Sequence, residues 1–190
     1  MLKHFGVAVR MTIVSIVIFG LIYPLAMTGL AETIFPNQAN GSLVTVDGKV
    51  VGSRIVGQRW TMPRYFQGRP SAAGKGYDPT STGGTNYGAT SKKLVDDARA
   101  TIAALKKRNP DAKGEPPIDL VTASASGIDP DISPEAAYWE APRIAKARNA
   151  SVDVVNALIA KHVQGRTFGF LGEPHVNVLE LNLALDGLEP

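Results

Sequence analysis

Residues 11 to 31 read MTIVSIVIFGLIYPLAMTGLA and contain no charged side chain. At about 1.5 Å of helical rise per residue, this stretch spans about 30 Å, the thickness of the hydrocarbon core of a bilayer. Two interpretations are open, a retained membrane anchor or a cleaved signal peptide, because Gly29, Leu30 and Ala31 form a small-x-small cleavage pattern. The run exceeds the roughly 7 to 15 apolar residues of a signal peptide, and Tyr23 suits a membrane interface. The stretch therefore favours a retained transmembrane helix.

The charges around this stretch predict its orientation. Lys3 and Arg10 precede it and Glu32 follows it. Positive residues flanking a span remain on the cytoplasmic side, so the bulk of the chain is expected outside the cytoplasm. The predicted organisation is a short cytoplasmic N-terminus (1–10), one transmembrane helix (11–31) and an extracytoplasmic domain (32–190).

A narrow face of the N-terminal helix carries small residues. Ala8, Thr12 and Ser15 recur at i, i+4 and i+7, and small side chains let another membrane helix approach closely. Scattered small residues also occur in lone anchors, so helix packing and simple anchoring are both open. No charged side chain lies between Arg10 and Glu32, so the span by itself offers no charged ligand for an ion path.

The rest of the chain is nearly neutral. Two of the 20 Lys and Arg residues, Lys3 and Arg10, precede the first acidic residue, which leaves 18 basic and 17 acidic side chains after Arg10. This balance does not favour a nucleic-acid partner. The absence of cysteine excludes disulfides, thiol nucleophiles and thiolate metal sites.

Strand patterns occur in three places. LVTVDGKVV at residues 43–51 predicts a hairpin, because Asp47 and Gly48 tolerate the positive φ angles of a tight turn. A short apolar run at 118–122 predicts another strand. Leucines alternate with polar residues at 179–186, which predicts a half-buried strand.

Helix patterns alternate with these strands. Apolar residues at helical spacing follow Ser91 and end before Asn109-Pro110, and Ser133-Pro134 and Ser151 each predict a helix start. Pro142 is expected to interrupt the second of these helices. The fold class is therefore a mixed α+β extracytoplasmic domain anchored by one N-terminal transmembrane helix.

A long segment without periodicity separates the hairpin from the first of these helices. Residues 57–90 are rich in Gly, Pro, Ser and Thr, and a loop of this length is either functional or poorly ordered. Its aromatic residues favour order, because disordered segments contain few of them.

No catalytic or metal site is predicted. Asp129 and Asp131 have calcium-loop spacing, but Pro134 stands where the sharp turn of that loop needs glycine, so both aspartates are expected in turns and caps. The three histidines are not spaced as a metal triad: His4, His162 and His175.

Arginines recur every five residues from Arg54 to Arg69, with aromatic residues between them. Outside the cytoplasm such a pattern favours contact with acidic protein surfaces or lipid headgroups, and separate solvated arginines are an equal alternative. The residues are Arg54, Arg59, Trp60, Arg64, Tyr65, Phe66 and Arg69.

Several long motifs in fixed order resemble one family over essentially the whole chain. They are GQRWTMPRYFQGRPSAAG (57–74), STGGTNYGATS (81–91), VTASASGIDPDISPEAA (121–137), PRIAKARN (142–149) and GRTFGFLGEPHVNVLELNLALD (165–186). The chain resembles the C subunits of the Kdp-type potassium-transporting ATPase of bacteria.

This resemblance implies a single-pass inner-membrane protein with a periplasmic domain. Its partners are then a channel-like K+-selecting subunit, a P-type ATPase subunit, a small membrane subunit and the lipid bilayer. The chain would be non-catalytic and bind no cofactor firmly, while the complex handles ATP and K+. It would assist assembly and raise the effective ATP affinity of the ATPase subunit. Candidate contacts with partners are Arg59, Tyr65, Phe66, Arg69 and Asn86.

The resemblance also suggests nucleotide contacts at Ser124, Ser126 and Gly127. In a periplasmic domain these residues would not meet cytoplasmic ATP, so an effect on ATP affinity would reach the ATPase as a coupling between sites. Our hypothesis is that residues 121–140 form a helix-capping corner that positions the domain against its partner.

Two alternatives from other classes remain open. One is a stand-alone membrane-anchored hydrolase or ligand-binding module, and the other is a structural anchor protein without a transport role. The chain has no GxSxG nucleophile elbow. A paired-carboxylate hydrolase would draw on Asp78, Asp129, Asp131, Glu140 or Glu173.

Overall fold

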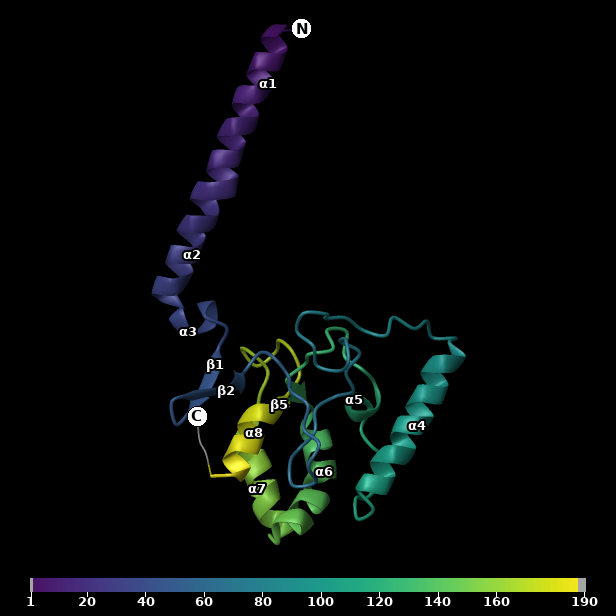
Figure 1. Cartoon of the computed structure of the whole chain (residues 1–190). Coiled ribbons are helices and arrows are strands. Elements are labelled where there is room, and N and C mark those ends of the chain that lie inside the picture. Colours follow the sequence, from purple (N-terminus) through teal and green to yellow (C-terminus); the bar gives the residue numbers. More distant parts are fainter. Residues whose placement is uncertain (1, 188–190) are drawn as a thin grey trace. The chain divides into compact units, whose positions relative to one another are not determined.

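The computed structural model of the chain describes residues 2–187 and the side chains of residues 4–187 (Figure 1). It consists of two compact units, residues 1–43 and residues 44–190.

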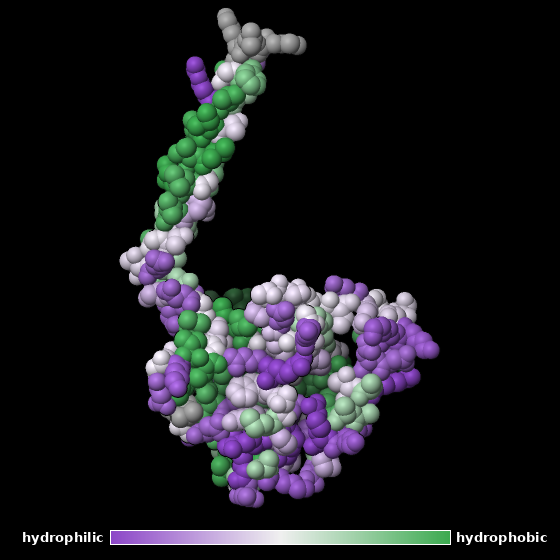
Figure 2. Space-filling view, viewed as in Figure 1, coloured by the Kyte–Doolittle hydropathy of each residue, from purple (hydrophilic) through white to green (hydrophobic). Residues whose placement is uncertain are grey.

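The N-terminal unit is mainly one long helix. It comprises α1 (Leu2–Ser15), the π-helical segment η1 (Ile16–Ile22) and α2 (Tyr23–Ile34), and the short helix α3 (Pro36–Ala39) follows. Among the described residues, one helix, His4–Ile34, is long and apolar enough to cross a membrane. Its apolar side chains are exposed, and Figure 2 shows hydrophobic side chains along its middle. The predicted membrane helix is therefore present as a helix and extends beyond residues 11–31.

The π-helical segment ends two residues before Pro24. A proline inside a helix has no N–H to donate, and its ring crowds the carbonyl group four residues earlier. A π-helical turn bonds each carbonyl group to the N–H five residues on and is therefore wider. This geometry accommodates Pro24 without ending the helix.

The second unit begins with the predicted hairpin. Strands β1 (Leu43–Val46) and β2 (Lys49–Ser53) pair with each other. Asp47 and Gly48 both have positive φ angles, 50° and 74°, as the two central residues of a tight hairpin turn require. The hairpin prediction is confirmed.

The three predicted helices are confirmed as α4 (Lys92–Arg108), α6 (Pro134–Arg148) and α7 (Val152–His162). Ser133 and Ser151 cap α6 and α7, because each hydroxyl accepts a hydrogen bond from the backbone N–H three residues on.

The expected interruption at Pro142 is wrong, because α6 continues through this residue. A proline within a helix removes one backbone bond, but burial of the neighbouring residues stabilises a helix independently of its local preferences. Ala141 and Ile144 are both fully buried, so tertiary packing overrides the local signal.

The strands predicted at 118–122 and 179–186 are also wrong. Residues Ile118–Val121 form one helical turn, α5, after Pro117. Residues Val178–Leu185 form α8, which is capped by Asn177. Alternation failed as a signal because α8 is buried on most sides, and leucine suits a helix better than β-branched residues do. Its buried residues are Val178, Leu179, Leu181, Asn182 and Leu183.

A small antiparallel sheet lies beside these helices. Its strands are β3 (Asp131–Ile132), β5 (His175–Asn177) and β4 (Val163–Gln164), in the order β3-β5-β4. Ile132 and Val163 both pair with Val176, one on each side of β5.

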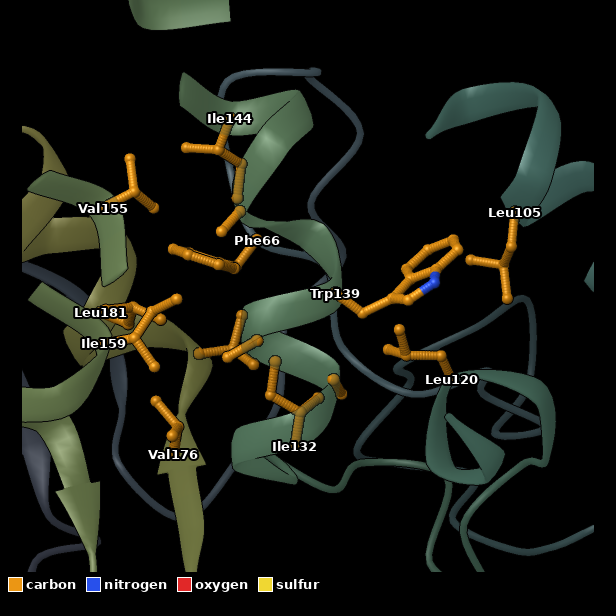
Figure 3. Packing of buried hydrophobic residues seen from close by; sticks show 14 of the residues in the cluster. Phe66, Leu105, Leu120, Ile132, Trp139, Ile144, Val155, Ile159, Val176 and Leu181 are labelled. Carbon is orange, nitrogen blue, oxygen red and sulfur yellow. The ribbon is translucent and has the colours of Figure 1, made fainter. Parts of the chain in front are cut away.

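Helix α6 passes through the centre of the hydrophobic core (Figure 3). Trp139 extends from one side of α6 towards Leu105 of α4 and Leu120 of α5, while Phe66 and Ile144 lie towards the other side. The second side includes residues from α7, α8 and β5: Val155, Ile159, Leu181 and Val176. Burial of α6 on both sides fixes the positions of the loops attached to it.

Candidate functional site

Residues 124–129, which we call the serine corner, form turns closed by their own side chains. Ser124 Oγ accepts a hydrogen bond from the Gly127 N–H at 2.8 Å, and Ser126 Oγ accepts one from the Ile128 N–H at 3.2 Å. Short polar side chains that bond in this way stabilise tight turns. Ser124 is buried and Ser126 is exposed. The predicted nucleotide residues therefore lie together, with both hydroxyl groups already bonded to the chain.

Gly127 lies where a larger residue would not fit. Its φ angle is +71°, and a Cβ atom at this position would lie 2.7 Å from both the backbone N of Ala73 and the carbonyl oxygen of Gly83. The Ser71 hydroxyl donates a hydrogen bond to the Gly127 carbonyl group. The serine corner is thus enclosed by backbone from residues 71–83.

The long loop at residues 57–90, which we call the clamp loop, is tied to the serine corner through backbone bonds. The Gly57 N–H donates to the Ile128 carbonyl oxygen at 2.8 Å, and the Gly83 N–H donates to that of Ser126 at 2.9 Å. The loop contains no helix or strand. Its predicted order thus arises from contacts with a distant segment.

Arg69, Tyr77 and Asp129 link the two loops through side chains. Arg69 Nη1 lies 3.0 Å from Asp129 Oδ2, and the Tyr77 hydroxyl donates to the Arg69 carbonyl oxygen at 2.6 Å. The Tyr77 N–H donates to Ser71 Oγ at 2.7 Å. Burial, together with the charge of Asp129, raises the pKa of Tyr77 to about 12, although Arg69 opposes the shift. A neutral phenol buried at this junction stabilises it.

Sequence reasoning missed Ser71 and Tyr77 as parts of this site. Their partners lie 56 and 8 residues away in the chain, and no local spacing identifies such contacts. Asp129, by contrast, was expected in a turn, and its Oδ1 accepts a hydrogen bond from the Asp131 N–H at 3.1 Å. Local turn and capping residues can be recognised from a sequence, whereas the contacts that the clamp loop makes with them cannot.

Comparison with known proteins places the whole chain in one family. Residues 5–187 match the family described as KdpC, K+-transporting ATPase, c chain. The chain belongs to the KdpC family. It is similar to proteins named potassium-transporting ATPase KdpC subunit from three organisms. The relative from Koribacter versatilis is 49% identical over 100% of this chain and 97% of its own length. Those from Myxococcus xanthus and Bradyrhizobium diazoefficiens are 52% and 50% identical, over 98% of this chain and 89% and 98% of their own lengths.

The resemblance inferred from the sequence is thereby confirmed. This KdpC chain is the C subunit of a potassium-transporting ATPase, and it has one N-terminal candidate membrane helix. Membership of the family disfavours the alternative of a hydrolase that acts alone.

The candidate partner contacts of this KdpC chain lie in different surroundings. Arg59 and Asn86 are exposed, and Tyr65 is half-buried with its hydroxyl 2.6 Å from Asp186 Oδ2. Phe66 is fully buried in the core and is therefore not a surface residue in this structure. Arg59 and Asn86 are thus the most accessible of these candidates.

The arginine series does not form a free basic patch, because three of its four members pair with carboxylates of this KdpC chain. The fourth, Arg59, donates to the Lys75 carbonyl oxygen at 2.5 Å. The regularly spaced arginines thus form ion pairs within the chain. These pairs are Arg54–Glu180 at 2.8 Å, Arg64–Asp186 at 3.2 Å and Arg69–Asp129 at 3.0 Å.

A buried ion pair lies on α6 beside the clamp loop. Glu140 Oε1 lies 2.7 Å from Arg143 Nη2, and Glu140 Oε2 accepts a hydrogen bond from the Gln67 N–H at 2.8 Å. Burial raises the pKa of Glu140, while Arg143 and the Gln67 N–H oppose the shift. The sequence did not lead us to predict this ion pair, although Glu and Arg at i and i+3 are a recognisable helix pair.

The small residues Ala8, Thr12 and Ser15 are all exposed on α1, and their role in helix packing stays a prediction. Within the described residues, no group of three or more His, Asp or Glu side chains could hold a metal ion. His162 makes a local contact, between its Nδ1 and the Leu158 carbonyl oxygen at 2.9 Å, and His175 Nε2 lies 4.0 Å from Asp131 Oδ2.

Proposed function

We propose that this chain is an accessory, non-catalytic subunit that stabilises the potassium-transporting complex and raises the effective ATP affinity of its ATPase subunit. In this proposal the complex handles ATP and K+, and the partners are an ATPase subunit, a channel-like subunit and a small membrane subunit. The observation that carries it is the closed hydrogen bonding of the serine corner. Ser124, Gly127 and the clamp loop bond to one another, which supports a rigid joint rather than a nucleotide site.

The proposal includes a topology in the bacterial inner membrane. Residues 1–10 lie in the cytoplasm, residues 11–31 span the bilayer and residues 32–190 lie in the periplasm. The positions of Lys3 and Arg10 before the span and of Glu32 after it support this orientation. A periplasmic domain does not meet cytoplasmic ATP. Its effect on ATP affinity is then a coupling free energy transmitted through the complex.

The N-terminal helix is proposed to pack against a partner through Ala8, Thr12 and Ser15. These residues share one face of α1 and are exposed within the described chain. Small residues allow two membrane helices to approach closely, so that van der Waals contacts stabilise their association.

Co-purification with two matched triple variants tests the helix contact. Gentle solubilisation of tagged wild-type protein should recover the ATPase and channel-like subunits, with K+-dependent ATP hydrolysis. Leucine at positions 8, 12 and 15 should reduce this recovery. Leucine at Val7, Met11 and Val14, which share another face at the same spacing, should leave it unchanged. Full recovery of the partner subunits with both variants would indicate that the helix acts only as a membrane anchor.

The serine corner is tested separately by replacing Ser124 and Ser126 together with alanine. We expect less assembled complex and an unchanged KM for ATP in the complex that remains. Ser81→Ala, an exposed change in the clamp loop, is the control and should alter neither quantity. Intact assembly with a raised KM for ATP would instead indicate a nucleotide contact at these serines.

A further inference from the structure

A pocket of about 440 Å³ lies between α4, the clamp loop and α6. Three arginines line it, Arg59 and Arg69 from the clamp loop and Arg108 from the end of α4. Trp60 and Glu140 also contribute to its wall. The pocket therefore gathers cationic groups from segments that are far apart in the sequence.

Two of these arginines have no directly paired carboxylate among the described residues. Arg69 is paired with Asp129, but within the described residues neither Arg59 nor Arg108 forms an ion pair with a carboxylate. Arg59 donates to the Lys75 carbonyl oxygen, and Arg108 donates to Gln67 Oε1, both of which are neutral acceptors. A guanidinium group has five N–H donors, so one such bond does not saturate it.

The one carboxylate in the wall is bonded to groups other than Arg59 and Arg108. Both oxygens of Glu140 are engaged, one with Arg143 and the other with the Gln67 N–H. Arg143 pairs with Glu140, and Arg108 also interacts with this carboxylate electrostatically. The three arginines of the wall together with Arg143 still outnumber the carboxylates of Glu140 and Asp129, so the pocket is positive. A positive pocket repels cations, including K+, and attracts anions.

Two donors on residues of this wall lack an acceptor. Trp60 Nε1 and Arg69 Nε are buried, and neither has a hydrogen-bond partner in the described part of the chain. A buried N–H group without an acceptor destabilises a fold, and each such group in a native structure calls for a physical reason. An oxyanion held between the arginines would supply acceptor oxygens next to these residues.

We propose that this pocket binds a small soluble oxyanion, a phosphate or a carboxylate group, through Arg59 and Arg108. Guanidinium groups match both anions because their parallel N–H groups bond to two oxygens at once. The site is separate from the serine corner, whose hydroxyl groups bond within the chain. Anion binding there would make the stability of the second unit depend on the anion concentration. This property goes beyond the accessory role proposed above.

Tryptophan fluorescence of the full-length chain in neutral detergent tests the proposal, because Trp60 is one of only two tryptophans. Sodium phosphate and sodium acetate are titrated at constant ionic strength against sodium chloride. We expect a saturable change with at least one oxyanion and a rise in melting temperature at the same concentrations. Comparison of phosphate with acetate assigns the preferred geometry.

Matched arginine variants make the test specific. Arg108→Gln and Arg59→Gln should each raise the apparent Kd at least tenfold. Arg99→Gln, an exposed change on the same helix as Arg108, should leave it unchanged. Both pocket arginines bond to flexible or exposed groups, so at least one variant is expected to fold. No saturable response in the wild-type chain, or an equal response in the pocket variants and Arg99→Gln, would overturn the proposal.

Discussion

Asn182 binds the backbone of Phe66 on both sides of the residue. Its Oδ1 accepts a hydrogen bond from the Phe66 N–H at 2.8 Å, and its Nδ2 donates one to the Phe66 carbonyl oxygen at 3.0 Å. Asn182 is 1% exposed and Phe66 is fully buried. One side chain on α8 thereby pairs two backbone groups of the clamp loop, 116 residues away, that would otherwise be buried without partners.

Replacement of Asn182 by leucine should lower the free energy of unfolding by roughly 2 to 5 kcal/mol, because two buried backbone groups lose their partners. Chemical denaturation of the full-length chain measures this change. Asn156→Leu is the control. Asn156 Oδ1 is already buried without a partner, so its removal should change stability by less than about 1 kcal/mol. Equal losses in both variants would contradict this interpretation.

Replacement of Gly127 by alanine should destabilise the fold by roughly 2 to 4 kcal/mol, because the added methyl group meets the backbone of Ala73 and Gly83. Gly114→Ala is a matched control, since Gly114 has a similar φ of +78° but no atom within 4 Å of an added Cβ. It should cost only the backbone strain of about 1 to 2 kcal/mol. Thermal melting of both variants separates crowding from strain, and equal losses would argue against a closed corner.

Alkaline pH should weaken the junction at Tyr77. Its pKa of about 12 in the folded chain exceeds the ordinary value of 10, so its contribution is fully present below pH 10 and is lost as pH rises towards 12. A shift of this size corresponds to roughly 2 to 3 kcal/mol. Tyr77→Phe removes the titrating group and should flatten the fall in stability between pH 10 and 12. An unchanged slope in this variant would assign the alkaline loss to other groups.

Single cysteines should report the proposed topology, because the sequence contains no cysteine. A membrane-impermeant maleimide, applied to cells with a permeabilised outer membrane, should label Ser81→Cys at once. His4→Cys should react only after the inner membrane is lysed. Both side chains are exposed, so burial does not explain a difference between them. The reverse pattern would place the second unit in the cytoplasm.

The sequence predicts those parts of the fold whose signals are local. The turn at Asp47-Gly48 and the caps at Ser133 and Ser151 lie next to the elements that they define, and all three are confirmed. The alternation at 179–186 wrongly predicted a strand, because α8 is buried on most sides. Pro142 wrongly predicted an interruption, because packing in the core stabilises α6. Both errors arise where tertiary packing outweighs local preference.

The candidate site could be predicted only in part. The turn-forming role of Asp129 follows from residue type and spacing, and residues 121–140 were expected to form a corner. The enclosure of this corner by Ser71 and Gly83 does not follow, because no periodicity relates segments more than 40 residues apart. Both segments belong to motifs shared with the family, but the motifs do not indicate that the two segments are in contact.

The π-helical turn before Pro24 affects how the faces of the membrane helix are counted. Each π-type hydrogen bond spans one residue more than an α-type bond, so the helix after Tyr23 is rotated relative to a continuous α-helix. The stripe of Ala8, Thr12 and Ser15 therefore does not continue at the positions that steps of three and four residues would select. A helical-wheel diagram drawn through the whole span assigns its second half to the wrong sides. A scanning mutagenesis series should count the two halves independently.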